Sequence, residues 1–144
     1  MIKRYVYRPE KKEYLLPSRK PNVVTDKEQL LGFVQDTNAS DIEERFAKAL
    51  EKLNKDYIFR VPLGQVGEPG WKELDFMVID GGYFPIEIDE MGFIHQGKET
   101  QDALKDAFVM DYFKDYNPFP VKRITGERLA TQEIADQTAK ELFP

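Results

Sequence analysis

The chain of 144 residues is long enough for one domain, and its 41% apolar and 12% aromatic content is typical of a folded globular protein. It has no cysteine, which excludes disulfides and thiolate metal sites, and its net charge of −5 argues against a broad, non-specific grip on nucleic acid. No apolar run reaches membrane-spanning length, and the N-terminal segment has no signal-like apolar core. We therefore expect a cytoplasmic protein with no membrane partner.

The charge is distributed unevenly along the chain. Residues 1–20, the basic arm, carry seven lysine or arginine residues against two glutamates. Residues 1–38 have weak periodicity and are expected to form an N-terminal extension to a main domain over residues 39–144. The arm is either a solvated segment or a polyanion-binding segment that acts through Lys3, Arg4, Arg8, Lys11 and Lys12.

The first clear element is a helix that begins at Ser40, where Ser40 and Glu43 fit a capping box. β-Rich residues then predict a strand over 57–61, a second strand from 71 or 72 to 79, and a third that begins at Phe84. The Asp80-Gly81-Gly82 segment between the last two strands is a hairpin signal.

A second helix is predicted over about 96–113, followed by a fourth strand over 121–125 and a last helix that ends near residue 142. The side chains expected to face inward from the second helix are Leu104, Ala107, Phe108 and Tyr112. The order helix, three strands, helix, strand, helix predicts an α/β or α+β fold, with a mixed four-stranded sheet flanked by helices.

Acidic residues interrupt the two central strands. Asp75 lies in a strand that is apolar on both faces, and Glu87 and Asp89 lie on one face of the next strand. A buried carboxylate is costly unless it is paired or binds a metal ion. The three acids are therefore either a metal site or part of a structural network of charges.

The register of the hairpin decides whether these acids meet. A two-residue loop at the glycine pair turns Asp75 to the face away from Glu87. A three-residue loop over 81–83 places Asp75 opposite Asp89 and diagonal to Glu87, and one of the two glycines then takes a positive φ. The sequence permits both loops, but only the second lets the carboxylates share an ion.

Three carboxylates on one sheet face favour a hard divalent cation, Mg²⁺ or Mn²⁺. An ion held by few carboxylates keeps positions for water and phosphate, which is the composition of a phosphodiesterase site. Two further residues have open roles. Glu43 is a capping residue that could also reach the sheet, and His95 is the only histidine and follows the acids closely.

Taken in order, these residues resemble the PD-(D/E)xK nuclease superfamily, and within it the branch of very short patch repair endonucleases and their small relatives. The helix motif S-x-x-E-x-x-(L/F)-x-x-x-L is matched by Ser40, Glu43, Phe46 and Leu50. A following strand and P-(I/L)-G turn are similar to residues 59–64, and a strand that ends in D-F is matched at 74–76.

The resemblance continues in the second half of the chain. The motif (V/I)-E-(V/I)-D-G-x-x-H is similar to residues 86–89 followed by 92–95, D-x-x-(R/K)-D to residues 102–106, and V-x-R-I-T to residues 121–125. The match covers about residues 40–142, and it implies a restriction-endonuclease-like fold.

The resemblance also implies roles for the acids. Asp75 and Glu87 would hold the metal ion, Asp89 would support or bind it, Glu43 would contribute directly or through water, and His95 would be a candidate base or phosphate contact. Two departures bear on this site. Glu90 and Met91 are inserted before the G-x-x-H unit, and the usual lysine, two residues after the glutamate, is replaced by Asp89. The residues that could supply the missing positive charge or contact phosphate are Lys98, Gln101 and Lys105.

The function implied is a metal-dependent DNA endonuclease or nickase that hydrolyses phosphodiester bonds, with DNA as partner and homodimer formation as an option. The rival hypothesis is a catalytically inactive protein of nuclease fold that acts as a binding or structural component. A third hypothesis is a nucleic-acid binder that acts through the basic arm alone.

Overall fold

The computed structural model describes residues 7–8, 13–14, 29–64, 72–90 and 98–144, and the side chains at 98–100 are not among those described. The predictions for His95, for the side chains of the basic arm and for the loop over 65–70 therefore lie outside the described residues. The same holds for the side chain of Lys98 and for the insertion at Met91.

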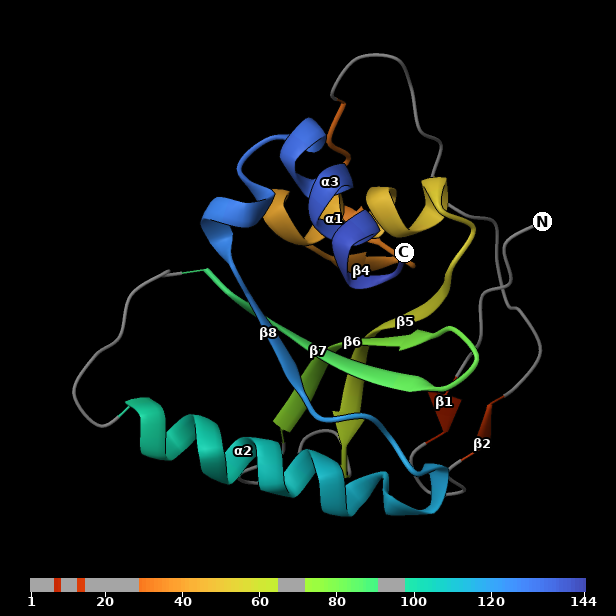
Figure 1. Cartoon of the computed structure of the whole chain (residues 1–144), viewed down its shortest axis with the longest axis vertical. Helices are drawn as coiled ribbons and strands as arrows, with labels where there is room; N and C mark the ends of the chain where they lie inside the picture. Colours follow the sequence, from red (N-terminus) through yellow and green to blue (C-terminus); the bar gives the residue numbers. More distant parts are fainter. Residues whose placement is uncertain (1–6, 9–12, 15–28, 65–71, 91–97) are drawn as a thin grey trace.

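Four strands form one mixed sheet in the order β5-β6-β7-β8 (Figure 1). The strands are β5 (Asp56–Leu63), β6 (Lys72–Ile79), β7 (Tyr83–Asp89) and β8 (Lys122–Thr125). The first three are antiparallel neighbours, and β8 runs parallel to β7. Parallel neighbours need a crossover, which contains α2 (Lys98–Tyr112). The predicted α+β fold with a mixed four-stranded sheet is confirmed.

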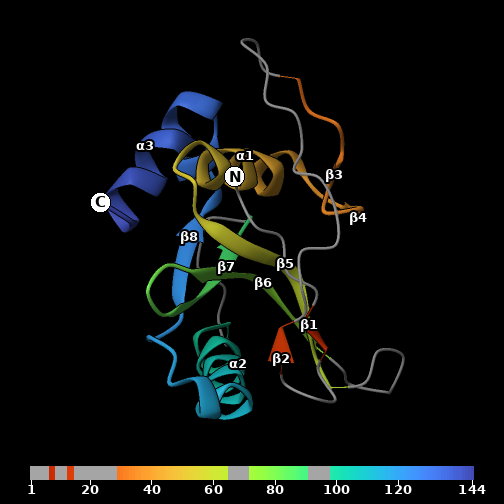
Figure 2. The same cartoon turned by 90° about the vertical axis from the view of Figure 1, so that its right-hand side faces the viewer.

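Helices cover both faces of this sheet (Figures 1 and 2). α1 (Asp41–Lys52) and α3 (Gln132–Leu142) lie together on one face, and α2 lies on the other. Two short 3₁₀ helices are η1 (Lys114–Tyr116) and η2 (Gly126–Leu129). Two small hairpins precede α1: β1 (Tyr7–Arg8) with β2 (Glu13–Tyr14), and β3 (Phe33–Val34) with β4 (Thr37–Asn38). Within the described ranges, no helix is long and apolar enough to cross a membrane.

Each face of the sheet has its own apolar core. On the α1 and α3 face, the rings of Phe46 and Phe76 meet edge to face with centroids 5.0 Å apart. On the α2 face, Met77 of β6 packs with Val109 and Phe113, and all three are fully buried. Successive strand residues point to opposite faces. Asp75 therefore shares the α2 face with Met77.

α2 is rotated relative to its predicted orientation. Leu104 and Phe108 were expected to face inward, yet they are 68% and 45% exposed. Ala107 is exposed as well, and of the four predicted residues Tyr112 is the one that packs against the core. The other inward positions are Lys105, Val109 and, directly after the helix, Phe113, which are spaced by four residues and so lie on one side. The reason is that the sheet presents the carboxylate of Glu87 to the N-terminal half of α2, where a lysine is a better neighbour than a leucine.

The β6–β7 hairpin has a loop with an odd number of residues, which places the acids on one face of the sheet. Its pairing of residues, however, differs from the predicted one. Ile79 pairs with Tyr83 and Phe76 with Ile86, which leaves a three-residue loop over 80–82. Gly81 has a φ of +68°, as an odd-length loop of this kind requires. The predicted loop over 81–83 is wrong by one residue, so the same register places Asp75 level with residue 87 and not with residue 89.

The start of α1 confirms the capping box. The hydroxyl of Ser40 accepts from the Glu43 N–H at 3.3 Å, and the Glu43 carboxylate accepts from the Ser40 N–H at 2.9 Å. The segment before it packs on α1. Val34 is fully buried in the α1 and α3 core, and the Glu44 carboxylate accepts the N–H groups of Leu31 and Gly32. Glu43 in turn reaches the sheet, where its carboxylate contacts Arg60 of β5.

Candidate functional site

Asp75 and Glu87 meet where the regular pairing of β6 and β7 ends. The Asp75 N–H donates to Glu87 Oε2 at 2.9 Å, and the Ile88 N–H donates to Asp75 Oδ2 at 2.8 Å. The last bridged pair on this ladder is Phe76 with Ile86. Beyond it, each carboxylate accepts a backbone N–H group of the opposite strand. The structure therefore brings together two of the three predicted metal ligands.

These two carboxylates lie in a poorly solvated position. Glu87 is 3% exposed and Asp75 is half-buried. Burial raises the pKa of Asp75 to about 7, and repulsion from Glu87 and Glu43 adds to the increase. The hydrogen bond from Ile88 and the positive charge of Lys105 oppose it. The metal-free pair thus holds one carboxyl group that titrates near neutral pH.

Lys105 approaches the pair from α2 and forms an ion pair with Glu87 Oε1. Of the two predicted charge or phosphate contacts whose side chains are described, Lys105 and Gln101, Lys105 is therefore the one that contacts the acids. Gln101 is exposed on the same helix. The positive charge beside the acids therefore comes from the helix that follows β7.

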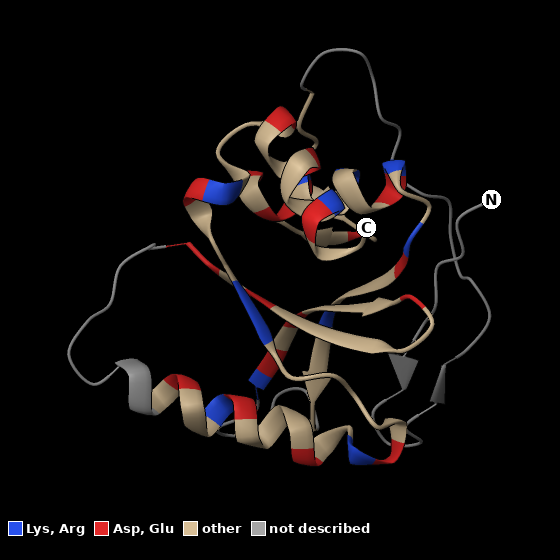
Figure 3. Cartoon of the chain, viewed as in Figure 1, with Lys and Arg blue, Asp and Glu red and all other residues tan. Residues whose placement is uncertain are grey.

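A second set of ion pairs holds this half of α2 on the sheet. Arg123 of β8 pairs in register with Glu87 of β7, and its guanidinium contacts Asp106 at 2.6 Å and Asp102 at 3.5 Å. No residue from 101 to 108 is buried, so no apolar side chain anchors this part of the helix. Acidic and basic residues are interspersed along α2 (Figure 3). We call Arg123, Asp102 and Asp106 the α2 latch, because they fix the segment that carries Lys105.

Arg60 lies on the other side of Asp75, on β5, and is not among the site residues predicted from the sequence. Its Nη2 contacts Glu43 Oε1 at 3.2 Å, and its Nη1 contacts Glu73 Oε1 at 3.4 Å. The charges of Glu43, Glu73 and Asp75 together outweigh the effect of burial and raise the Arg60 pKa. The signal that was available is that Arg60 is the only charged residue within the β-rich segment 57–61.

Asp89 and Glu43 are the remaining predicted site residues whose side chains are described. Asp89 pairs in register with Thr125 at the end of β7 and is half-buried. Among the described residues, no three histidine, aspartate or glutamate side chains form a group arranged to hold a metal ion. Ligation by Asp89 together with Asp75 and Glu87 therefore stays a prediction. Glu43 is 5% exposed and is near enough to raise the pKa of Asp75, as predicted from the edge of the first helix.

The carboxylates of Asp75 and Glu87 are suitable ligands for a divalent cation. Carboxylate oxygens are the ligands that Mg²⁺ and Mn²⁺ prefer, and a bound cation relieves the repulsion that, after burial, contributes to the raised pKa of Asp75. The ion pair between Lys105 and Glu87 already neutralises one charge of the pair. The donor set is therefore compatible with a metal ion that is completed by water, by phosphate or by Asp89.

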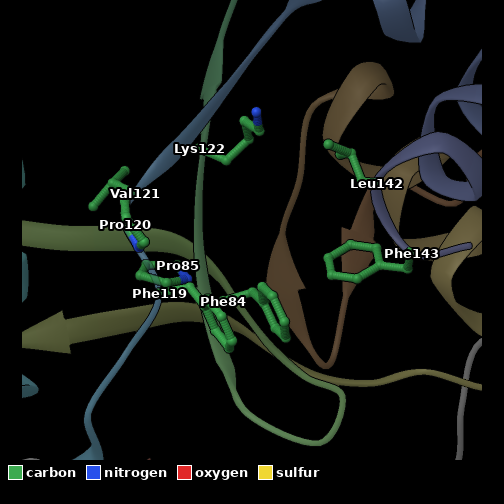
Figure 4. Close-up of a pocket in the computed structure, with 8 residues that line it drawn as sticks. All are labelled: Phe84, Pro85, Phe119, Pro120, Val121, Lys122, Leu142 and Phe143. Carbon is green, nitrogen blue, oxygen red and sulfur yellow. The ribbon is translucent and has the colours of Figure 1, made fainter.

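A separate pocket lies away from these acids (Figure 4). Its volume is about 310 Å³, and its walls are mostly apolar. Phe84 stacks on Phe119 with ring centroids 4.3 Å apart, and Phe143 meets Phe84 edge to face. Phe84 belongs to the α1 and α3 side of the sheet, opposite the face of Glu87. Lys122 is the only charged residue that lines the pocket, so it offers no carboxylate ligand.

Comparison of the chain with protein-family models, with curated proteins and with solved structures found no match.

Proposed function

We propose that the chain is a metal-dependent phosphodiesterase of the PD-(D/E)xK type, acting on DNA as an endonuclease or nickase. The observation that carries this proposal is the contact of Asp75 and Glu87 at the end of the β6–β7 ladder, with Lys105 on Glu87. The element order and the position of Glu43 at the start of α1 support it, because they agree with the arrangement that the resemblance implies.

Each residue has a role that its position supports. Asp75 and Glu87 would hold Mg²⁺ or Mn²⁺, with Asp89 as a further ligand, and the bound ion supplies Lewis-acid polarisation of the phosphate and an acidified water. Lys105 fixes the orientation of Glu87 and places a positive charge beside the pair. A fixed positive charge at this point stabilises the negative charge that develops on phosphate oxygens during hydrolysis.

One observation favours the alternative of a catalytically inactive protein that acts as a binding or structural component. Lys105 forms an ion pair with Glu87 and Arg60 forms one with Glu43, so two of the acids already have cationic partners within the chain. A structural network of this kind needs no metal ion. The two functions differ in whether the protein binds Mn²⁺ through Asp75.

The test is a cleavage assay over single-stranded, duplex, nicked and branched DNA with Mg²⁺ or Mn²⁺. We expect wild type to cut at least one form, and Asp75→Asn to cut none while it keeps its fold. Asn keeps an oxygen that can accept the Ile88 N–H, so the backbone contact survives. The matched control is Asp111→Asn, a side chain on α2 that is 81% exposed.

Calorimetry with Mn²⁺ separates the two functions. Binding by wild type that is lost in Asp75→Asn and kept in Asp111→Asn supports the phosphodiesterase. Absence of Mn²⁺ binding, together with absence of cleavage of all four DNA forms, would leave the structural alternative in place.

A further inference from the structure

Arg60 has an unusual backbone conformation for its position. Its φ is +56°, and of the described non-glycine residues with positive φ it is the only one inside a β-strand. The others, Gln35, Asp36, Asn54 and Asn117, lie in turns or at helix ends. A left-handed conformation is strained for a residue with a Cβ, and such strain is concentrated at functional sites.

The strain lies directly beside the acids. Phe59 pairs with Phe76 and Val61 with Leu74, so Arg60 stands level with Asp75 without forming a bridge to it. The regular pairing of β6 is therefore interrupted at Asp75 on both sides, by Arg60 on β5 and by the carboxylate contacts on β7. The conformation of Arg60 determines where its side chain leaves the strand.

The guanidinium of Arg60 is held loosely by its present partners. Its contacts to Glu43 and Glu73 are 3.2 and 3.4 Å, whereas charge-assisted hydrogen bonds between arginine and carboxylate are usually about 2.7–2.9 Å. Its Nε is buried without a hydrogen-bond partner, while the side chain as a whole is 33% exposed. Each Nη carries two N–H donors and uses one of them on Glu73 or Glu43, so one N–H of each Nη remains available to another ligand.

We propose that Arg60 binds a phosphate group of the DNA backbone at this site, on the β5 side of Asp75, opposite Lys105. This inference rests on the proposed function, because it assumes that the phosphodiester lies over Asp75. Arginine suits such a role because its planar fork binds two phosphate oxygens at once. The strained backbone would then be retained because it directs the guanidinium toward the substrate.

The test measures DNA binding by fluorescence anisotropy as a function of salt, with Ca²⁺ in place of Mg²⁺. A residue that neutralises one phosphate contributes about 0.9 to the slope of log K against log salt concentration. We expect Arg60→Gln to lower the magnitude of the slope by about that amount and to weaken binding about tenfold. Arg128→Gln, which alters a half-exposed arginine paired with Glu141, is the matched control and should leave both unchanged.

A second variant distinguishes loss of the phosphate contact from misfolding. Arg60→Gly removes the side chain and also relieves the strained φ, so it should fold and show the same loss of slope. A wild-type slope in both Arg60 variants would overturn the inference even if wild type cuts DNA. If wild type cuts no DNA but its binding still depends on Arg60, the phosphate contact stands and the nuclease function falls. No DNA binding by wild type would overturn both.

Discussion

Asp75 and Glu87 each accept a backbone N–H group of the other strand, at 2.8 and 2.9 Å, so that two side chains take over from the ladder where β6 and β7 separate. These hydrogen bonds to the backbone hold both carboxylates in position, in addition to the rotamer preferences of the two side chains. It also holds Asp75 in a poorly solvated position beside a second carboxylate, so burial first and repulsion from Glu87 second raise the pKa of Asp75. Several properties of the protein should depend on this relationship.

Stability should fall as pH rises through the range in which Asp75 titrates. Its pKa is raised from 3.8 to about 7, so between these values the folded protein keeps a proton that the unfolded chain has lost. The contribution of Asp75 to the free energy of unfolding is therefore highest below pH 4 and declines as the pH rises to 7. Three pH units correspond to an upper limit of about 4 kcal/mol at 1.36 kcal/mol each. Urea unfolding at a series of pH values measures it.

The Asp75→Asn variant should lack this decline, because it has no proton to lose at that position. Asp111→Asn should keep it, since Asp111 is exposed on α2. Equal pH dependence in wild type and Asp75→Asn would show that Asp75 is not the group with the raised pKa.

Binding of Mn²⁺ should release a proton at acidic pH. In the metal-free protein Asp75 is mostly protonated near pH 6, and a carboxylate must be ionised to hold a cation. Proton release should approach one per ion near pH 6 and approach zero near pH 8. Calorimetry in buffers of different ionisation enthalpy measures the number. If Mn²⁺ binds near pH 6 without proton release, the ion is bound by groups other than Asp75.

Part of this arrangement could be predicted from the sequence. The glycine pair after Asp80 permitted a loop of even or odd length, and the metal-site interpretation of the three acids required an odd-length loop that places them on one face. An odd-length loop is present. The exact pairing could not be fixed, because a three-residue loop can begin at 80 or at 81 without any change in which residues share a face. The side-chain contact between Asp75 and Glu87 depends on that choice.

Two other features had no usable local signal. Two sets of apolar side chains could face the sheet from α2: Leu104 with Phe108, or Val109 with Phe113. The second set faces the sheet because the carboxylate of Glu87 lies under the N-terminal half of the helix, where it pairs with Lys105. The left-handed conformation of Arg60 is also invisible in the sequence, because arginine has no preference for positive φ. Tertiary contacts decide both.

The α2 latch should control the mobility of the N-terminal half of α2. Arg123→Gln removes the contacts to Asp106 and Asp102, and this part of the helix buries no apolar side chain that would replace them. Amide hydrogen exchange should therefore become faster around residues 102–106 and stay unchanged in β6. Because Lys105 lies in the same segment, metal-dependent cleavage should fall in parallel. Arg128→Gln is the control, and unaltered exchange in Arg123→Gln would mean that other contacts hold the helix.

Glycine should be more stable than alanine at position 60, although alanine is ordinarily better in a strand. Both substitutions remove the ion pairs with Glu43 and Glu73, so the difference between them isolates the backbone. At a φ of +56°, alanine keeps a steric cost of about 1 kcal/mol that glycine does not have. Chemical denaturation of Arg60→Gly and Arg60→Ala gives the difference directly. If alanine is the more stable, the left-handed conformation is not retained once the guanidinium is removed, and the arginine side chain, not the surrounding sheet, holds the backbone in its strained form.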